Sequence, residues 1–278
     1  MTYSIVARDP ATGQFGVAVQ SRYFSVGSVV PWAAPGVGAV ATQAFTEIGY
    51  GPRGLELMRS RSSATQALDR LIEEDEDREV RQVAMVDGNG RVAVHTGDRC
   101  VPAAGHATAE GVSTQANMMD RETVWGAMLS AYAGAEVPFP ERLLAALWAA
   151  ESEGGDIRGR QSAALLVVDA ASTDSWRRSV DLRVEDHPDP VTELERLLRV
   201  HRAFEHLSRG DELASAGNLE QAAGELEQAH ALGPDDDQIA FVYGLMLVGT
   251  GRPVEGRELL ERARAANPRW AEYLRRSR

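Results

Sequence analysis

Apolar and polar positions change their spacing several times along the chain, and each change predicts a different element. Short runs rich in β-branched residues at 3–7 and 15–20 are separated by the turn formers of residues 9–13, a pattern that predicts a β-hairpin. Residues 36–44 predict a third, buried strand. From Pro52 onward apolar residues recur at three- and four-residue intervals, which predicts two consecutive helices.

The middle of the chain returns to strands and then to helices. The turn sequence at residues 87–90 joins two β-branched runs and is the strongest hairpin signal in the chain. Grouped strands and grouped helices are typical of stacked sheets between helical layers, and not of alternating β-α-β units. We therefore expect a four-layer α+β domain over residues 1–185. Its remaining predicted elements are strands at 80–86, 91–96, 101–106 and 111–115, helices at 121–133 and 140–153, and strands at 161–169 and 175–184.

The chain after this domain is helical and repetitive. Residues 185–190 are acidic and hold two prolines, which predicts a linker because proline interrupts both strands and helices. Residues 191–278 then show helical periodicity and an internal offset of 34 residues. The period and its small residues resemble the tetratricopeptide repeat, which implies a small all-α domain over 191–278. The pairs at this offset are Gly210/Gly244, Gly217/Gly251, Leu226/Leu260, Ala229/Ala263 and Pro234/Pro268.

Two repeats are fewer than the roughly three that such arrays need for stability on their own. We therefore expect the repeat segment to pack against the preceding helix at 191–208, against the first domain or against a second subunit. Its function is either to bind a protein partner in a groove or to serve as a packing and self-association surface. The sequence leaves both possibilities open.

Composition and charge narrow the function classes. Of the 278 residues 44% are hydrophobic and 25% charged, and the formal charge is −12. This charge repels phosphate backbones and anionic bilayers, and no apolar run reaches the ~18 residues of a membrane helix, so we expect neither a nucleic-acid nor a membrane partner. Cys100 is the only cysteine, which excludes an intramolecular disulfide and a multi-thiolate zinc site. Residues 1–6 lack the pattern of a secretory signal, and we expect a cytoplasmic protein.

The basic residues are all arginines, 29 in number. Without lysine the chain has no Schiff-base amine, no Walker-type phosphate lysine and no Ser-Lys dyad, so a catalytic base must come from elsewhere. Thr2 offers one, because methionine aminopeptidases remove Met1 before a small residue and leave a hydroxyl beside a free α-amine with a pKa of about 8. Such an amine can accept the hydroxyl proton directly or through one water. The alternative is a strand-end threonine without a chemical role.

The order of elements after Thr2 resembles that of the N-terminal nucleophile hydrolases. A closer resemblance, to the domain-of-unknown-function 1028 family, rests on four motifs between residue 2 and about residue 185. It implies a four-layer αββα hydrolase-like fold for residues 1–185. The motifs are TYSIVARDPATGQFGVAVQSRYFSVG, VPWAAPGVGAVATQAFTEIGYGPRGLELM, GDRCVPAAGHATAEG and GGDIRGRQSAALLVV.

The hydrolase resemblance also implies roles for residues 154–162. In N-terminal nucleophile hydrolases such as the proteasome, this junction delivers an Asp and a Ser beside the terminal amine, positions that Asp156 and Ser162 would fill here. Arg158 carries a planar guanidinium that can bind a substrate carboxylate in a bidentate manner. The alternative is a Gly-rich turn in which Asp156 pairs with Arg158. The proteasome's lysine on the third strand has no counterpart, so other groups must tune the amine.

Further candidate positions lie at strand ends. Asn117 stands where a predicted strand meets the third helix, and the unpaired N–H groups of a helix N-terminus suit a developing oxyanion. Asn117 is therefore the oxyanion candidate, with a helix cap as the alternative. Ser21 and Arg22 follow the second strand, and Thr42 and Gln43 end the third. The fold implied by the resemblance lines its cleft at these two places, so we expect these four residues to contact the substrate.

Cys100 and His106 are close enough in sequence to form a thiol-imidazole pair. A nucleophilic cysteine needs a helix N-terminus or a fixed basic neighbour, which a hairpin region does not offer. Four further histidines show no metal-ligand spacing among themselves, and we predict neither a metal nor another cofactor; they are His187, His201, His206 and His230. The leading hypothesis is an N-terminal threonine hydrolase that cleaves a small amide through Thr2. The alternatives are a non-catalytic binding or assembly protein that retains the hydrolase fold and, third, a thiol hydrolase at Cys100.

Overall fold

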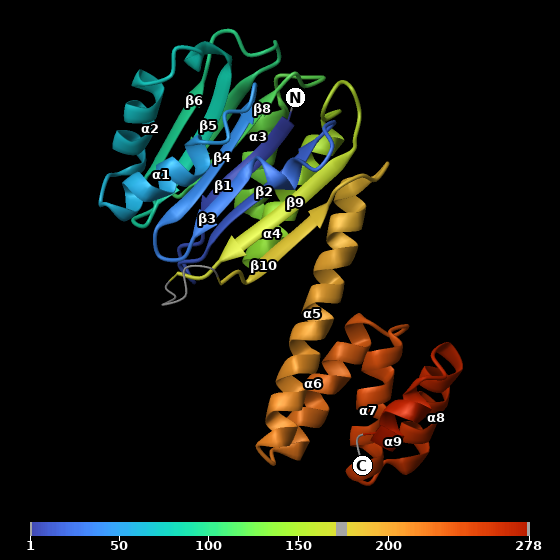
Figure 1. Ribbon diagram of the computed structural model, residues 1–278. Coiled ribbons are helices and arrows are strands. Elements are labelled where there is room, and N and C mark those ends of the chain that lie inside the picture. The colour runs from blue at the N-terminus through green and yellow to red at the C-terminus, as the bar shows by residue number, and fades with distance from the viewer. Residues whose placement is uncertain (1, 171–176, 277–278) are drawn as a thin grey trace. The chain divides into compact units, whose positions relative to one another are not determined.

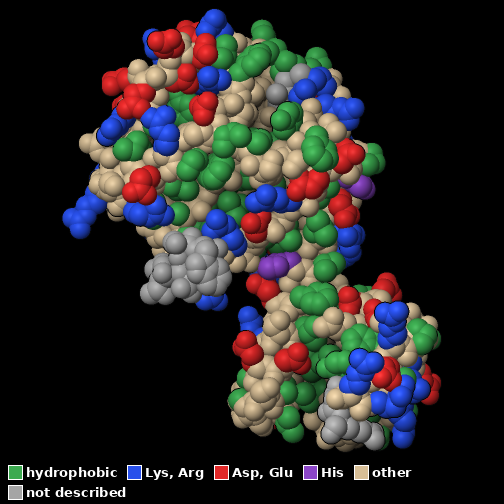
Figure 2. Space-filling view, viewed as in Figure 1, with side chains coloured by type: hydrophobic (Ala, Val, Ile, Leu, Met, Phe, Trp, Pro, Cys, Tyr) green, Lys and Arg blue, Asp and Glu red, His purple; other side chains and the backbone are tan. Residues whose placement is uncertain are grey.

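A computed structural model describes residues 2–170 and 177–276 of the chain. It divides into two compact units, residues 1–195 and 196–278, the first mixed α/β and the second helical (Figure 1). Acidic and arginine side chains are intermixed with hydrophobic ones on the face drawn in Figure 2. Among the described helices, none is both long enough and apolar enough to cross a membrane.

The described strands of the first unit form two antiparallel sheets. The larger sheet has the order β10-β9-β2-β1-β8-β7 and the smaller has the order β3-β4-β5-β6. β1 therefore lies inside the larger sheet, between β2 and β8. The strands are β1 (Thr2–Arg8), β2 (Phe15–Ser21), β3 (Pro31–Ala34), β4 (Gly38–Ala44), β5 (Arg81–Asp87), β6 (Val92–Thr96), β7 (Gly105–Ala109), β8 (Val112–Asn117), β9 (Ser162–Val168) and β10 (Val180–Val184).

The two sheets pack face to face through small and branched apolar side chains. The period of two along each strand decides which residues take part, because neighbouring side chains point to opposite faces. In β4, Ala39 and Ala41 belong to the core between the sheets, whereas Val40 packs with the helices on the other face. The same core contains Val17 and Val19 of β2. Close packing of this kind fixes the register of both sheets.

Helices contact the remaining face of each sheet (Figure 1). The helices α1 (Tyr50–Arg59) and α2 (Ala64–Glu73) bury their apolar side chains against β4 and β5, and Ser63 and Gln66 form a capping box that starts α2. The helices α3 (Val124–Gly134) and α4 (Phe139–Ser152) contact the larger sheet, α3 at β7 and β8 and α4 at β1 and β2.

Several boundaries differ from the expectations above. The strand predicted at 101–106 is β7, Gly105–Ala109. The predicted strand 36–44 begins at Gly38, and β3 precedes it as an element that the pattern did not reveal. β3 starts with a proline, which is tolerated there because β3 is an edge strand of its sheet. The predicted helix 121–133 begins only at Val124. The last strand begins at Val180, and residues 175–176 of its predicted span lie outside the described residues.

The repeat segment is built from paired helices. Gly210 and Gly244, one repeat apart, are both sites of close helix approach: a Cβ on Gly210 would lie 2.8 Å from Leu226, and one on Gly244 would lie 2.9 Å from the Gly256 carbonyl. The 34-residue offset therefore reflects the small residues that the packing of each pair requires. The helices are α5 (Pro190–Ser215), α6 (Leu219–Leu232), α7 (Asp237–Gly249), α8 (Pro253–Ala266) and α9 (Trp270–Arg276).

Candidate functional site around Thr2

Thr2 belongs to a row of polar side chains that crosses four neighbouring strands at one end of the larger sheet. Ser162 of β9 pairs with Ser21 of β2, and Thr2 of β1 pairs with Asn117 of β8. The Thr2 hydroxyl donates a hydrogen bond to the Ser21 hydroxyl over 3.0 Å and closes the row. All four residues are buried. The antiparallel register thus gathers four of the predicted site residues from distant parts of the sequence.

Two amide side chains of the smaller sheet, Gln43 and Gln82, form a hydrogen-bond network with Asn117 and with the backbone of Thr2. Gln43 Nε2 donates to the Thr2 carbonyl oxygen over 3.2 Å and to Gln82 Oε1 over 2.7 Å. Asn117 Nδ2 donates to the same carbonyl over 3.3 Å and to Gln82 Oε1 over 2.9 Å. Ser4 donates its hydroxyl proton to Gln43 Oε1. A buried network in which each amide is bonded holds its members in fixed positions, so the backbone of Thr2 is clamped between the two sheets.

A cavity of about 280 Å³ opens beside Thr2. It borders the predicted residues Thr2, Ser21 and Arg158, and its wall is otherwise mostly apolar. The residues that line it are Thr2, Ser21, Tyr23, Val26, Val29, Val30, Ala44, Phe45, Thr46, Ile48 and Arg158. A buried hydroxyl group at the edge of an apolar pocket is an arrangement suited to reaction with a bound small molecule.

Left-handed backbone conformations occur directly after two members of the network. Ala44 follows Gln43 with a φ of 71°, and Met118 follows Asn117 with a φ of 59°. Such a conformation costs an L-residue roughly 1–2 kcal/mol, and residues in strained conformations tend to cluster at functional sites. The strain at both positions is therefore independent support for a site at this end of the sheets.

Asp156 connects two segments near the cavity. Its carboxylate accepts hydrogen bonds from the backbone N–H groups of Arg22 and Arg158, over 3.0 Å and 2.9 Å, and forms an ion pair with the Arg158 guanidinium. The Asp156 side chain is fully buried. The pairing with Arg158 is the arrangement of the Gly-rich turn considered above. The described contacts make Asp156 a brace between the 156–158 loop and the end of β2.

Ser162 supports the wall of the cavity. Its hydroxyl donates to the Tyr23 carbonyl and accepts from the Val26 backbone N–H over 3.0 Å. Tyr23 and Val26 both line the cavity. Ser162 is therefore placed to hold the loop after β2 in position. Its strand, β9, is separated from the strand of Thr2 by β2.

The structure separates Thr42 and Arg22 from the cavity. Because side chains alternate along β4, Thr42 points to the opposite face from Gln43, and its hydroxyl donates to the Glu47 carbonyl. The Arg22 side chain is exposed and donates to the Arg160 carbonyl. The described residues that line the cavity do not include Thr42, Arg22 or Gln43. Contact of these three residues with a substrate stays a prediction.

Asn117 lies in a different local setting from the one expected. It is the last residue of β8, and α3 begins only at Val124, so no helix N-terminus adjoins it. The expectation of helical backbone donors at Asn117 is therefore wrong. Its Nδ2 group is instead engaged in the network, since it donates to the Thr2 carbonyl and to Gln82 Oε1.

Cys100 and His106 have separate partners. The Cys100 thiol donates to the Arg81 carbonyl, and His106 Nδ1 is bonded to the Thr96 hydroxyl. Burial raises the pKa of Cys100, which keeps the thiol protonated at neutral pH. Burial, with a smaller contribution from His95, lowers the pKa of His106. This environment disfavours a thiolate nucleophile.

Sequence reasoning missed several buried polar residues of the site. Gln82, Gln115 and Ser4 are fully buried, and Gln115 Nε2 donates to the Ser4 hydroxyl over 2.6 Å. On the other face of β1, the Tyr3 hydroxyl donates to Glu151, and burial together with that carboxylate raises the pKa of Tyr3 well above its ordinary value. The available signal was a polar residue inside an otherwise apolar strand, as in the segment Arg81–Asp87.

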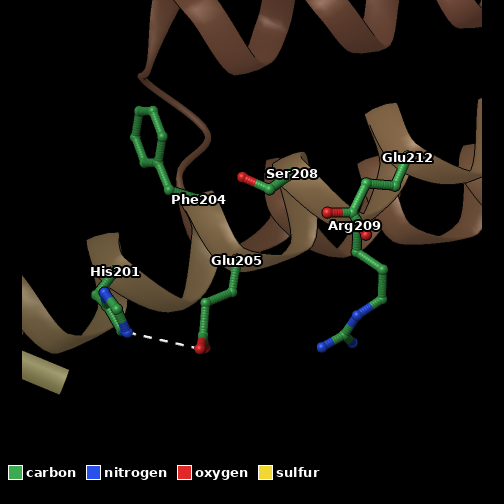
Figure 3. A pocket seen from close by; sticks show the side chains of 6 residues that line it. All are labelled: His201, Phe204, Glu205, Ser208, Arg209 and Glu212. Carbon is green, nitrogen blue, oxygen red and sulfur yellow. Dashed lines mark ion pairs between the residues drawn. The ribbon is translucent and has the colours of Figure 1, made fainter. Parts of the chain in front are cut away.

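A second depression, of about 390 Å³, lies on α5 (Figure 3). His201 and Glu205 point toward one another there, with 3.5 Å between Nε2 and Oε1. The six lining residues, His201, Phe204, Glu205, Ser208, Arg209 and Glu212, recur at the spacing of one helix face. A contact between a histidine and a carboxylate on a single helix face offers no activated nucleophile, and the candidate site therefore remains the cavity beside Thr2. Among the described residues, no group of three or more His, Cys, Asp or Glu side chains is arranged to hold a metal ion.

Comparison with known proteins gives matches to both parts of the chain. The model of a family described as "Family of unknown function (DUF1028)" matches residues 2–194, and a tetratricopeptide repeat model matches residues 213–275. A similar solved structure is that of protein SPO2555 from Silicibacter pomeroyi, described as a DUF1028 protein. It is 33% identical, with a TM-score of 0.65 over 71% of this chain and 88% of that one. No curated protein matches the chain.

Proposed function

The chain belongs to the family of unknown function DUF1028, and we propose that it is an N-terminal threonine amidohydrolase that cleaves a small amide. The observation that carries the proposal is the position of Thr2. Its hydroxyl borders a cavity, its carbonyl is held by Gln43 and Asn117, and it is the first residue of a strand inside the larger sheet. The proposal requires removal of Met1, which lies outside the described residues.

In the proposed first step, Thr2 Oγ attacks the carbonyl carbon of the amide while the Thr2 α-amine takes the hydroxyl proton. The Oγ–C bond forms, the C–N bond of the amide breaks, and the proton on the α-amine passes to the departing amine. Ser21 accepts the hydrogen bond of the Thr2 hydroxyl and thereby orients it. The product of this step is an ester between the acyl group and Thr2.

In the second step, water attacks the ester, its proton is taken by the free α-amine, and the acid leaves as Thr2 regains its hydroxyl proton. Asn117 takes a different role from the one expected, because its Nδ2 donors are used by Thr2 and Gln82. It is a positioning residue for the nucleophile in this mechanism. Asp156 and Ser162 position the loops that border the cavity.

The fold supports this proposal by analogy. We infer that the first unit is a four-layer N-terminal nucleophile hydrolase-like domain, with α1 and α2 on the smaller sheet and α3 and α4 on the larger. Fold analogy alone does not establish a reaction, since one fold hosts many functions. Thr2 and its contacts therefore carry the proposed chemistry.

The test is hydrolysis of a panel of small amides by protein whose intact mass shows a Thr2 terminus. We expect Thr2→Ala to reduce turnover at least a thousandfold, because it removes the nucleophile, and Thr2→Ser to retain measurable turnover on the same amine. Acetylation of the terminus should be as damaging as Thr2→Ala. Full activity of Thr2→Ala combined with loss in Cys100→Ala would overturn the proposal in favour of the thiol. A retained Met1 in active protein would also contradict it.

The repeat unit suggests a second candidate function, assembly through protein contacts. Leu245, Val248 and Val254 of α7 and α8 are exposed, with 63% of Val254 accessible. Exposed apolar groups on a repeat array are typical of contact surfaces. Self-association through this face is the corresponding proposal, and sedimentation equilibrium over a range of concentrations tests it. A monomer at all concentrations would exclude it.

A further inference from the structure

The cavity beside Thr2 has a chemical character that restricts its ligand. Val26 and Val30, each 1% exposed, are buried apolar residues of the lining, and Ala44 and Val29 extend the apolar wall. The hydroxyl groups of the lining, including that of Thr2, are the remaining uncharged polar groups. A pocket with this lining favours an uncharged, apolar group over a polar one, because a polar group would lose its water without gaining matching hydrogen bonds.

Charge reinforces this restriction. Arg158 is the one charged residue among the described residues that line the cavity, and its guanidinium is paired at 3.1 Å with the buried carboxylate of Asp156. The pair presents little net charge to the cavity. The guanidinium would repel an ammonium group on the ligand, and its two hydrogen bonds to Asp156 weaken its attraction for a carboxylate.

The mouth of the cavity is apolar as well. Tyr23, Phe45 and Ile48 line it and yet are exposed, at 56%, 60% and 44%. Single exposed hydrophobic residues are ordinary, but several around one pocket mark a surface that is covered when a ligand binds.

We propose that the substrate is an amide of an uncharged apolar acyl group, either branched aliphatic or aromatic. This inference rests on the proposed hydrolysis. The apolar group enters the cavity and places the scissile carbonyl at Thr2 Oγ. The cavity of about 280 Å³ holds one such group, and a larger substrate extends over Tyr23, Phe45 and Ile48. The enzyme then releases an apolar carboxylic acid and an amine.

The first test compares kcat/KM for matched anilides that differ only in the acyl group: phenylacetyl and isovaleryl against succinyl and aminoacetyl. We expect at least a tenfold preference for the two apolar acyl groups. Ile48→Ser and Phe45→Ser should each reduce kcat/KM for the phenylacetyl anilide about three- to tenfold. Val137→Ser is the matched control, because Val137 is 48% exposed and does not line the cavity. It should leave kcat/KM unchanged.

The second test measures binding without turnover. Phenylacetamide and succinamate are titrated into Thr2→Ala, and the chemical shifts of Tyr23 and Ile48 are followed by NMR. Selective binding of phenylacetamide without any turnover by the native chain would support the apolar site and refute the hydrolase. Turnover with a preference for charged acyl groups would leave the hydrolase in place and overturn the apolar assignment. Absence of both binding and turnover would overturn both proposals.

Discussion

Single residues at the site act mainly by holding one another in place. Gln82 illustrates this, since its Oε1 accepts from both Gln43 and Asn117, and its Nε2 donates to the Ala116 carbonyl over 2.9 Å. One side chain thereby joins the two amides that hold the Thr2 carbonyl. Buried amides carry a large cost when a partner is removed, so the network is stable only as a whole.

Gln82→Met therefore tests the network. Methionine fills a similar volume but leaves the donors of Gln43 and Asn117 without their shared acceptor, and we expect a loss of about 2–3 kcal/mol in the free energy of unfolding. Turnover should fall as well, because Thr2 loses its fixed position. Urea unfolding measures the first effect. Gln228→Met, at an exposed position of α6, is the control and should change the stability by less than about 0.5 kcal/mol. Equal effects of the two substitutions would contradict the role of Gln82.

His230 makes the repeat unit sensitive to acid. Burial, and then the nearby Arg262, lowers the pKa of His230 below its ordinary value of 6.5, and its Nδ1 is buried without a hydrogen-bond partner in the described residues. The unfolded chain therefore binds this proton more readily than the folded one, so stability falls as the pH drops below about 6.5. His230→Gln should weaken this dependence. Urea unfolding of both proteins at pH 7.5 and 5.5 checks it, and identical pH dependences would refute it.

The sequence predicted those residues of the candidate site that lie at or near recognisable strand ends. Thr2, Ser21, Asn117 and Ser162 each begin or end a strand, and Gln43 is the last residue but one of β4. The sequence pattern predicted these strands, and the five residues lie at the same end of the two sheets. Neither the side-chain alternation that turns Thr42 away nor the loop between Asn117 and α3 could be obtained from composition. Contacts between the sheets, such as that of Gln43 with Gln82, depend on tertiary packing and leave no local signal.

At the level of elements, hydrophobic spacing was reliable for long segments and poor for short ones. The repeat helices and the hairpin around residues 87–90 followed from periodicity and turn chemistry. β3 has four residues and a leading proline, so it has too few positions for an alternating pattern. Its existence is fixed by pairing with β4, a contact that only the folded chain reveals.

Two helical glycines allow a test of element packing. Gly126 in α3 is exposed, and a Cβ there would meet no atom within 4 Å, so Gly126→Ala should stabilise the protein by about 0.5–1 kcal/mol through helix propensity. Gly51 in α1 faces the Trp32 ring, and a Cβ would lie 2.3 Å from it. Gly51→Ala should therefore destabilise by about 1–3 kcal/mol. Thermal unfolding of the two variants measures both changes in stability. Melting temperatures that shift in the same direction would contradict the packing described.

At the scale of the whole molecule, each unit has its own hydrophobic core. The clusters of the repeat unit are drawn from helices α5 to α9, where Phe241 stacks on Trp270 with 4.4 Å between ring centroids and meets Tyr273 edge-on. The core between the two sheets is separate from these clusters and contains Phe15. Separate cores make separate unfolding transitions the expected behaviour.

Phe241→Ala should therefore act on one transition alone. It removes a side chain that is 1% exposed together with two ring contacts, a change that costs about 3–5 kcal/mol. In scanning calorimetry we expect the transition of the repeat unit to move to lower temperature while that of the first unit, and amide turnover, remain unchanged. Phe15→Ala, equally buried in the first unit, should produce the reverse pattern. A single transition lowered by both variants would show that the two units unfold together, and the repeat unit would then have to be treated as part of the folding unit that carries Thr2.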